Sequence, residues 1–369
     1  MQENEKLTEL VQQRLNQFLI SKSEVFELIT PELLALTDYA TTLLSSGKRF
    51  RARFAYWGWF AVFSDQIDPL LTPKQQLQAI VDTASALEIF HAAALVHDDL
   101  IDNSDTRRGQ PAAHKHFEDL HRNSEWRGNA AEFGRNTALL LGDLLLGFSD
   151  DLFDQALAQL SNASTIASAR QEFIRMRNEV TAGQYLDILE EQVWPFHSDE
   201  EAIGRAKRII TYKSAKYSVV APLRIGAAIA GASAAQLNAL SEYGMPLGIA
   251  FQLRDDLLGV YGDSTVTGKP SGDDLREGKR TILIALAKTS ATRSVARLID
   301  ELLGDAMLTD VQIGLLQSEI KLSGAVERLE RLISHQLLQA NAALDEAPLA
   351  EKAIQQLREL AIAAAKREA

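Results

Sequence analysis

The stretch HAAALVHDDLIDNSDTRRG, residues 91–109, closes a long apolar segment with a cluster of acids and two arginines. Asp98 and Asp102 lie four residues apart in it, and both carboxylates are therefore predicted on one face of a helix. Thr72 and Pro73, a capping hydroxyl followed by a proline at the first helical position, mark the start of this helix. Its apolar positions recur at helical spacing: Leu87, Phe90, Ala94, Leu95 and Ile101.

The two acids predict a bound cation. Like charges one turn apart destabilise a helix by a few tenths of a kcal/mol, so a compensating positive charge is expected. Magnesium fits, because it prefers oxygen ligands, takes one or two carboxylates and completes its shell with water and phosphate. Arg107 and Arg108 follow directly, and their guanidinium groups suit bidentate phosphate binding. Together these residues predict a diphosphate site, with a solvated acidic helix face as the alternative.

Two further charged stretches accompany the first. FQLRDDLLG, residues 251–259, carries a second acidic pair, which favours a metal site over a solvated face. SGKRFRAR, residues 46–53, follows an apolar helix, and Gly47 is placed to terminate that helix. A basic helix cap is the alternative to a phosphate site here.

HDDLID followed by RRG, FQLRDD preceding GK, and SGKR near the start resemble, in this order, the motifs of the trans-isoprenyl diphosphate synthases, or polyprenyl synthetases. The bacterial geranylgeranyl diphosphate synthases are the most similar members. The resemblance extends from about residue 40 to about residue 290. It implies head-to-tail (1′-4) condensation of isopentenyl diphosphate with dimethylallyl, geranyl or farnesyl diphosphate by Mg²⁺-assisted ionisation. Geranylgeranyl diphosphate is the expected product, and a farnesyl or a longer-chain product is the alternative.

The resemblance also implies roles for individual residues. The isopentenyl diphosphate site takes a glycine, three cations and a histidine, namely Gly47, Lys48, Arg51, His91 and Arg108. Magnesium would bridge the allylic diphosphate to three acids, Asp98, Asp102 and Asp255. Polar and basic groups would neutralise the remaining oxygens, namely Arg107, Lys213 with its neighbour Ser214, Gln252, Lys269 and Lys279. Gln184 matches a position near the allylic chain.

The sequence departs from the family pattern at two positions. Ser46 replaces the first of two glycines, and Gly259 replaces the third acid of the second motif, which reads DDLLG and not DDxxD. Magnesium there is expected to rest mainly on Asp255 and secondarily on Asp256. Asp273 and Asp274 are expected to add contacts outside the metal's own ligands.

The composition agrees with an all-α protein. Apolar residues follow a helical period almost throughout the 369 residues, 46% of which are hydrophobic, and strand-like alternation is scarce. We expect one domain over residues 1–369, a single large helical bundle, and the resemblance makes it the isoprenoid synthase type with a central cavity. The net charge of −12 argues against nucleic acid as a partner, and the absence of cysteine excludes disulfides.

No secretory signal is visible in the first residues, MQENEKLTEL, and no apolar run of about 18 residues is uninterrupted. The most apolar candidate, around residues 219–235, contains Arg224. A cytoplasmic protein without stable membrane insertion is therefore expected. The stretch 137–160 is more hydrophobic than one buried face requires, which together with the resemblance predicts a homodimer.

Product length is predicted from the turn before Asp98. Ala93 and Ala94 stand where short-chain members of the family commonly place an aromatic ring, and Phe90 is the next bulky group on that face. This pattern favours a product of twenty carbons, unless the alanines are small only to let a neighbouring helix pack closely.

A terpene cyclase is one alternative function, but such an enzyme would lack SGKR and RRG. A non-catalytic partner subunit is the other alternative, and the retained Arg107 and Lys213 argue against it.

Overall fold

The structure, a computed structural model, describes residues 2–63, 72–262, 271–305 and 307–365, and these are almost entirely helical. They form two compact units. Unit 1 comprises Met1–Ala169 with Ile225–Ala232, and unit 2 comprises Arg170–Arg224 with Ser233–Ala369. The predicted all-α class is confirmed, whereas a single domain over residues 1–369 stays a prediction.

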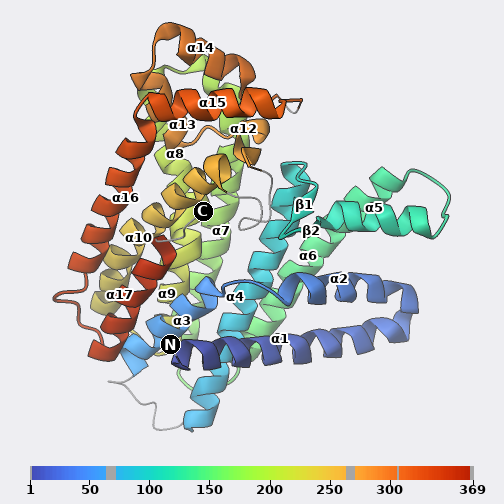
Figure 1. The fold of residues 1–369 in the computed structure, drawn as a ribbon. Helices are drawn as coiled ribbons and strands as arrows, with labels where there is room; N and C mark the ends of the chain where they lie inside the picture. Colours follow the sequence, from blue (N-terminus) through green and yellow to red (C-terminus); the bar gives the residue numbers. More distant parts are fainter. Residues whose placement is uncertain (1, 64–71, 263–270, 306, 366–369) are drawn as a thin grey trace. The chain divides into compact units, whose positions relative to one another are not determined.

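Unit 1 is organised around helix α4, Pro73–Ile101, which packs along α6, Ala130–Leu157 (Figure 1). Helices α1 and α2 form an antiparallel pair that packs against α4. The remaining elements of this unit are α1 (Gln2–Ile29), η1 (Pro31–Leu33), α2 (Leu34–Leu44), α3 (Phe50–Phe63), β1 (Thr106–Arg107), β2 (Gln110–Pro111) and α5 (Ala113–Asn123).

Helix α4 begins and ends where the sequence predicts. Thr72 and Gln75 cap each other's backbone N–H groups, and Pro73 occupies the first helical position. The helix ends at Ile101, and Asp102 follows as the capping residue, donating its N–H to the Asp98 carbonyl at 2.8 Å. Ile101 itself is exposed, because the last turn of α4 extends past the core.

Burial in unit 1 is densest along α4, and two close contacts explain how α6 approaches it. The imidazole of His97 lies where a side chain at Gly142 would be, because a Cβ there would come 2.1 Å from its Nε2. Ser149 donates to the Ala86 carbonyl at 2.8 Å.

Among the described residues, α4 is the helix that is long and apolar enough to cross a membrane, and the segment 219–235 is not. However, 83% of the most apolar window of α4 is buried inside the structure.

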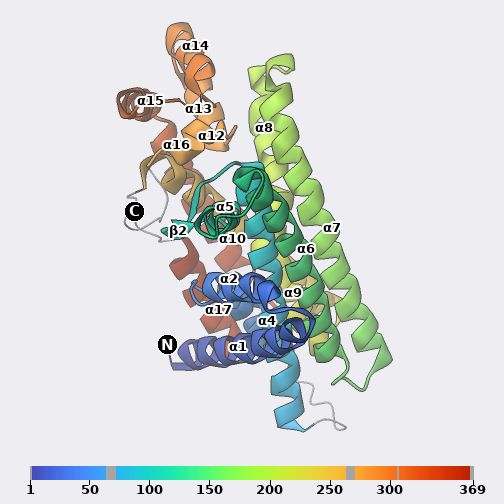
Figure 2. The ribbon, with the colours of Figure 1, turned by 90° about the vertical axis from the view of Figure 1, so that its right-hand side faces the viewer.

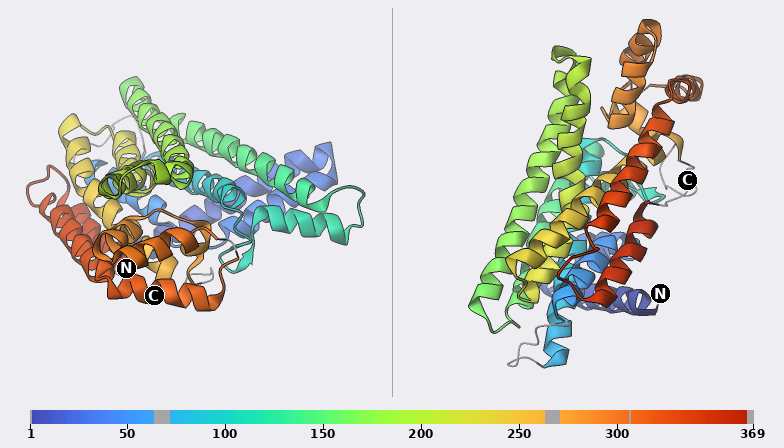
Figure 3. Two further views of the ribbon diagram at one scale, coloured as in Figure 1. Left: turned by 90° about the horizontal axis from the view of Figure 1, so that it is seen from above. Right: turned by 90° about the vertical axis from the view of Figure 1, so that its left-hand side faces the viewer.

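Unit 2 is organised around α10, Ala234–Tyr261, which packs against the π-helix η3, Ile210–Val220, and against α16 and α17 (Figure 3). Helix α7, Ala163–Val193, enters this unit from Arg170, and α8 lies beside it (Figure 2), joined by an ion pair of 2.5 Å between Glu190 and Arg205. The other elements are η2 (Trp194–Phe196), α8 (Asp199–Ile209), α9 (Ala221–Ile229, shared with unit 1), α12 (Asp273–Glu277), α13 (Ile282–Ser290), α14 (Arg293–Leu302), α15 (Asp310–Leu322), α16 (Ala325–Ala342) and α17 (Glu351–Ala365).

The C-terminal helices of unit 2 serve its core. Leu316, Ile320, Leu329 and Ile333 are buried in one apolar cluster with residues of α10 and α13. These helices therefore contribute to the packing of the core.

Candidate active site

In unit 1 four guanidinium groups lie near enough to one histidine to affect its charge. His91, partly buried on α4, has a pKa held well below its usual value, first by burial and then by the arginines around it, Arg51, Arg108, Arg107 and Arg49. The imidazole is therefore neutral at physiological pH. Four arginines gathered around a neutral ring attract an anion with several charges, such as a diphosphate.

A tight hairpin places Arg107 and Arg108 in this cluster of arginines. Strands β1 and β2 pair antiparallel, with Arg107 opposite Gln110, and Arg108 and Gly109 form the two-residue turn at φ 53° and 73°. Such turns match the twist of the strands. However, the left-handed backbone conformation of Arg108 costs about 1 kcal/mol or more. Arg108 offsets this cost by donating to the carbonyls of Ser46 at 2.7 Å and Leu43 at 3.1 Å.

Gly47 meets two separate demands at this point. Its φ of 125° suits only glycine, and a Cβ would stand 3.1 Å from the guanidinium of Arg108. Lys48 beside it is exposed, and Arg51 is partly buried at the start of α3. The stretch Ser46–Arg51 and the hairpin thus meet around Arg108. Of the residues predicted for isopentenyl diphosphate, the structure brings together Gly47, Arg51, His91 and Arg108.

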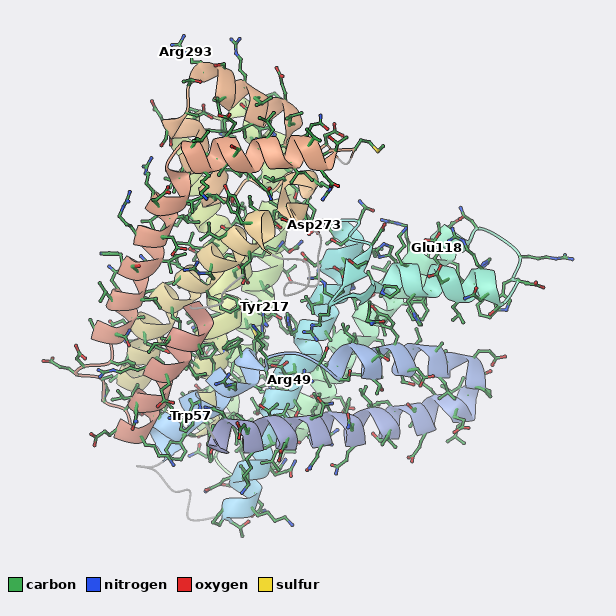
Figure 4. The ribbon with its side chains drawn as sticks, in the orientation of Figure 1. Arg49, Trp57, Glu118, Tyr217, Asp273 and Arg293 are labelled. Carbon is green, nitrogen blue, oxygen red and sulfur yellow. The ribbon has the colours of Figure 1, made fainter. Side chains whose placement is uncertain are left out.

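Arg49 lies where α2 gives way to α3 (Figure 4) and is not part of the predicted site. It is buried, with its Nη1 3.1 Å from Glu88 Oε2, while the other carboxylate oxygen of Glu88 accepts the Ala52 N–H at 3.2 Å. A buried arginine with its own carboxylate holds the loop in place. No local pattern predicts this pairing, because Glu88 lies 39 residues away on α4.

The acids of the first acidic motif have different partners. Asp99 is buried and grips Arg107 with both oxygens, at 2.9 and 3.1 Å from Nε. Arg107 Nη2 lies 3.9 Å from Asp98 Oδ2. Asp98 and Asp102 stand one turn apart at the end of α4, as predicted, and neither is the main partner of Arg107. Asp99 is thus a positioning residue that sequence reasoning did not assign.

In unit 2 an unforeseen acid lies between two predicted cations. Asp187 Oδ2 is 2.5 Å from Lys213 Nζ and 3.8 Å from Lys279 Nζ. Lys213 belongs to the π-helix η3, and Gly183 lets α7 approach it, because a Cβ there would lie 2.3 Å from the Lys213 nitrogen. Widened turns of this kind occur often at functional sites. Asp187 follows Gln184 by one helical turn, which was the available signal.

The second acidic motif lies near the end of α10. Asp256 is buried, and Gln252 donates to its Oδ1 at 2.8 Å, so this predicted diphosphate contact is directed at an acid. Its Oδ2 has no hydrogen-bond partner among the described residues. Burial raises the pKa of Asp256 well above its usual value, Gln252 opposes the shift, and Asp274, Asp255 and Asp187 add to it.

These residues fit a magnesium ion that is coordinated jointly by protein carboxylates and a bound phosphate. Within the described ranges, no three acids or histidines stand close enough to hold a metal alone. Magnesium needs only one or two carboxylates when a phosphate completes its shell, and the buried, unpartnered Asp256 Oδ2 marks a place where a hydrated cation would be stabilised. Lys269 lies outside the described residues, and its role stays a prediction.

Comparison with known proteins identifies the family. The family model described as "Polyprenyl synthetase" matches residues 32–313. The chain belongs to the polyprenyl synthetase family. A crystal structure of geranylgeranyl pyrophosphate synthase from Corynebacterium glutamicum, complexed with isoprenyl diphosphate and magnesium, is similar over 98% of this chain and 99% of its own, with a TM-score of 0.90 and 37% identity.

Two curated polyprenyl synthetase relatives are less similar in sequence. The short chain isoprenyl diphosphate synthase of Methanocaldococcus jannaschii is 29% identical over 65% of this chain and 65% of its own length. The geranylgeranyl diphosphate synthase of Mycobacterium tuberculosis is 29% identical over 84% of this chain and 78% of its own. The match therefore spans just under two thirds of the first relative and more of the second.

Proposed function

We propose that this polyprenyl synthetase joins isopentenyl diphosphate head to tail (1′-4) to an allylic diphosphate, with geranylgeranyl diphosphate as its main product. The observation that carries the proposal is the cluster of arginines around the neutral His91, held by Gly47 and the hairpin. Two of these arginines are paired with buried carboxylates, Arg49 with Glu88 and Arg107 with Asp99, and a compact polyanion would balance the remaining charge of the cluster. The acids at the end of α4 and near the end of α10 suit the metal that such substrates carry.

The residues of the chain would divide the reaction as follows. Asp98 and Asp102 would hold Mg²⁺ in unit 1, and Asp255 would hold Mg²⁺ in unit 2. A bound Mg²⁺ neutralises diphosphate as a leaving group. Arg107 and Lys213 are preorganised by Asp99 and Asp187, so they can stabilise charge that develops on a diphosphate without first reorganising.

The carbon chemistry needs no nucleophile from the protein. Cleavage of the allylic carbon–oxygen bond leaves a carbocation and diphosphate, the isopentenyl double bond attacks the cation, and the proton lost from the adduct goes to the departing diphosphate. Water would capture the cation as an alcohol, so apolar walls are required. Buried residues of α4 such as Phe90 and Ala93 would supply part of that wall.

The direct test is product analysis. Purified full-length protein would be incubated with Mg²⁺, isopentenyl diphosphate and, in separate reactions, dimethylallyl, geranyl or farnesyl diphosphate. We expect a prenyl diphosphate of twenty carbons as the main product by chromatography of the dephosphorylated chains. An Asp98→Ala variant is the matched control. No elongation of any primer would overturn the proposal.

The product length is proposed to depend on Phe90 and Ala93, both buried in α4. Phe90 lies about one turn, ~5 Å, before Ala94 along the helix, which is close to the length of one isoprene unit. Ala93→Phe should shorten the main product, and Phe90→Ala should lengthen it. If neither substitution shifts the distribution of products, another element sets the length.

The homodimer is also a proposal, and it rests on α6. Leu139 and Leu140 are 48% and 64% exposed on this helix, an apolar surface that an obligate interface would cover. Light scattering at micromolar concentration should give twice the mass of the 40.7 kDa chain, and a monomer would contradict the proposal. The cytoplasmic location stays a prediction.

A further inference from the structure

One face at the end of α7 carries three groups that each hold a cation of unit 2. Asp187, Glu190 and Trp194 follow one another at intervals of three and four residues, so they share a face, with Trp194 directly after the last residue of α7. The two acids form ion pairs with a lysine and an arginine. Trp194 instead offers the face of an indole ring, which attracts a cation without carrying a charge.

The cation over Trp194 is Arg280. Its Cζ lies 3.6 Å from the ring centroid, and its Nη1 donates to Asp300 Oδ1 at 3.1 Å. The side chain is only 10% exposed, and its buried Nε has no hydrogen-bond partner among the described residues. A guanidinium that forgoes one hydrogen bond in order to lie over a ring has its orientation set by stacking.

The surroundings of Trp194 leave no charge for a ligand. Lys288 Nζ lies 5.1 Å from the ring centroid and 2.8 Å from both Asp199 Oδ1 and Asp300 Oδ1. Each of the two cations at the ring, Arg280 and Lys288, therefore has an acid of its own. The cavity between these side chains, ≈ 30 Å³, has room for about two water molecules. This cluster is built to hold a position and not to bind a substrate.

What the cluster holds is the loop between α12 and α13. Lys279 precedes Arg280, and its Nζ lies 3.8 Å from Asp187 Oδ2. Two adjacent residues of the loop thus contact α7 at points seven residues, or about 10 Å, apart. The loop backbone is itself tightly packed, because a Cβ at Gly278 would lie 2.9 Å from a Cα atom of the chain after α14. Anchoring the arginine therefore also fixes the direction of the lysine.

We propose that Arg280 and Trp194 are positioning residues for Lys279. The guanidinium stacked on the indole ring holds the loop against α7, and the Lys279 ammonium is thereby kept beside Asp187 and Lys213, where it can meet a diphosphate. The inference deepens the proposed function and rests on it, because Lys279 is one of the cations expected to neutralise the allylic diphosphate. The charge of that site is thus placed by an uncharged ring at the end of α7.

The test is a double-mutant cycle measured by binding, so that turnover is not required. Inorganic pyrophosphate would be titrated into full-length protein with Mg²⁺ and followed by isothermal titration calorimetry. The variants are Trp194→Leu, Lys279→Met and the double variant that combines them, with Trp194→Phe as the conservative exchange. Arg177→Met is the matched control, because it removes an arginine whose Cζ lies 6.0 Å from the ring centroid of Phe173 on the same helix.

We expect Lys279→Met to raise the dissociation constant of pyrophosphate by about 10-fold or more, the effect of losing one hydrogen bond to a charged group. Trp194→Leu should raise it by about 5-fold, and Trp194→Phe, which keeps an aromatic face, by less than about 2-fold. Arg280→Lys should resemble Trp194→Leu, because a compact ammonium cannot both cover the ring and reach Asp300. The double variant should bind as Lys279→Met does, and Arg177→Met as the wild type does.

The double variant decides between a positioning role and a general structural one. Losses that add up in it would overturn the inference, because Trp194 would then act on the site without Lys279. Wild-type affinity in Trp194→Leu would overturn it as well. If circular dichroism shows that Trp194→Leu does not fold, the same cycle with Arg280→Lys decides. A wild-type protein that binds no pyrophosphate would overturn the proposed function, and the inference with it.

Discussion

The two acidic motifs begin alike, with adjacent aspartates near the end of a long helix, and the structure completes them differently. In unit 1 the second acid, Asp99, is buried against Arg107, which follows it by eight residues on the adjoining hairpin. In unit 2 the second acid, Asp256, is buried without a cation among the described residues, and the Asp274 carboxylate of α12 occupies the space beside Gly259. The buried acid of the first motif thus finds its cation within a short stretch of chain, whereas the second motif meets a further carboxylate only through the packing of another helix.

The difference shows that the packing of a second helix, and not the motif alone, decides which charged groups lie beside an acidic pair. A pattern such as DDxxD records where acids lie along one helix, and a metal responds only to where their oxygens lie. The two regions should also respond differently to the same substitution. The buried Asp99 of unit 1 is paired with Arg107, whereas the buried Asp256 of unit 2 has no cation beside it among the described residues.

The largest effect is expected for acids that hold metal. Asp98→Ala and Asp255→Ala should each lower turnover by several orders of magnitude, because the leaving diphosphate loses its neutralising ion. Asp256→Ala should be milder, since it is expected to act through the water shell of the metal. Steady-state kinetics would measure this, with thermal melting to show that each variant folds. Equal and severe losses for Asp255→Ala and Asp256→Ala would mean that both acids bind metal directly.

The second prediction compares the matched substitutions Asp99→Asn and Asp256→Asn in metal-free buffer. Asp99→Asn leaves Arg107 without its buried partner and should cost about 3 kcal/mol, at the low end for such pairs because Arg107 is partly exposed. Asp256→Asn replaces an acid that no described cation balances and keeps the acceptor for Gln252, so stability should stay within about 1 kcal/mol of the wild type.

Urea unfolding would measure both free energies. Similar losses from the two variants would break the distinction between a balanced acid and an unbalanced one. A gain in stability for Asp256→Asn would sharpen it.

The smallest effect concerns pH in the arginine-rich region. Because the folded pKa of His91 is lowered, the unfolded chain binds a proton that the folded chain refuses once the pH falls below the ordinary histidine value of about 6.5. Stability should therefore decline on acidification, by about 1 kcal/mol between pH 7 and 5.5 from this residue. His91→Gln should remove that part of the decline. If the free energy of unfolding falls equally with pH in the variant and the wild type, His91 does not contribute to the decline and the prediction is wrong.

Local features were the predictable ones. The start of α4 at Thr72 and Pro73 and its end beside Asp98 depend on capping and spacing within one segment, and the structure has both where expected. The place of Asp274 over Gly259 depends on how α12 packs against α10, and no pattern along the chain encodes it. The pairing of Asp187 with Lys213 escaped prediction for the same reason.

The π-helix from Ile210 to Val220 makes the length of that segment as important as its composition. Each of its turns closes from residue i to i+5 and holds one residue more than an α-helical turn. Deleting a residue between Lys213 and Val220 would change the number of residues that these turns hold and would therefore change the direction in which Lys213 points. Lys213 would then point away from Asp187, although every functional side chain was still present. The direction in which Lys213 points thus depends on the number of residues in this segment as well as on their identity.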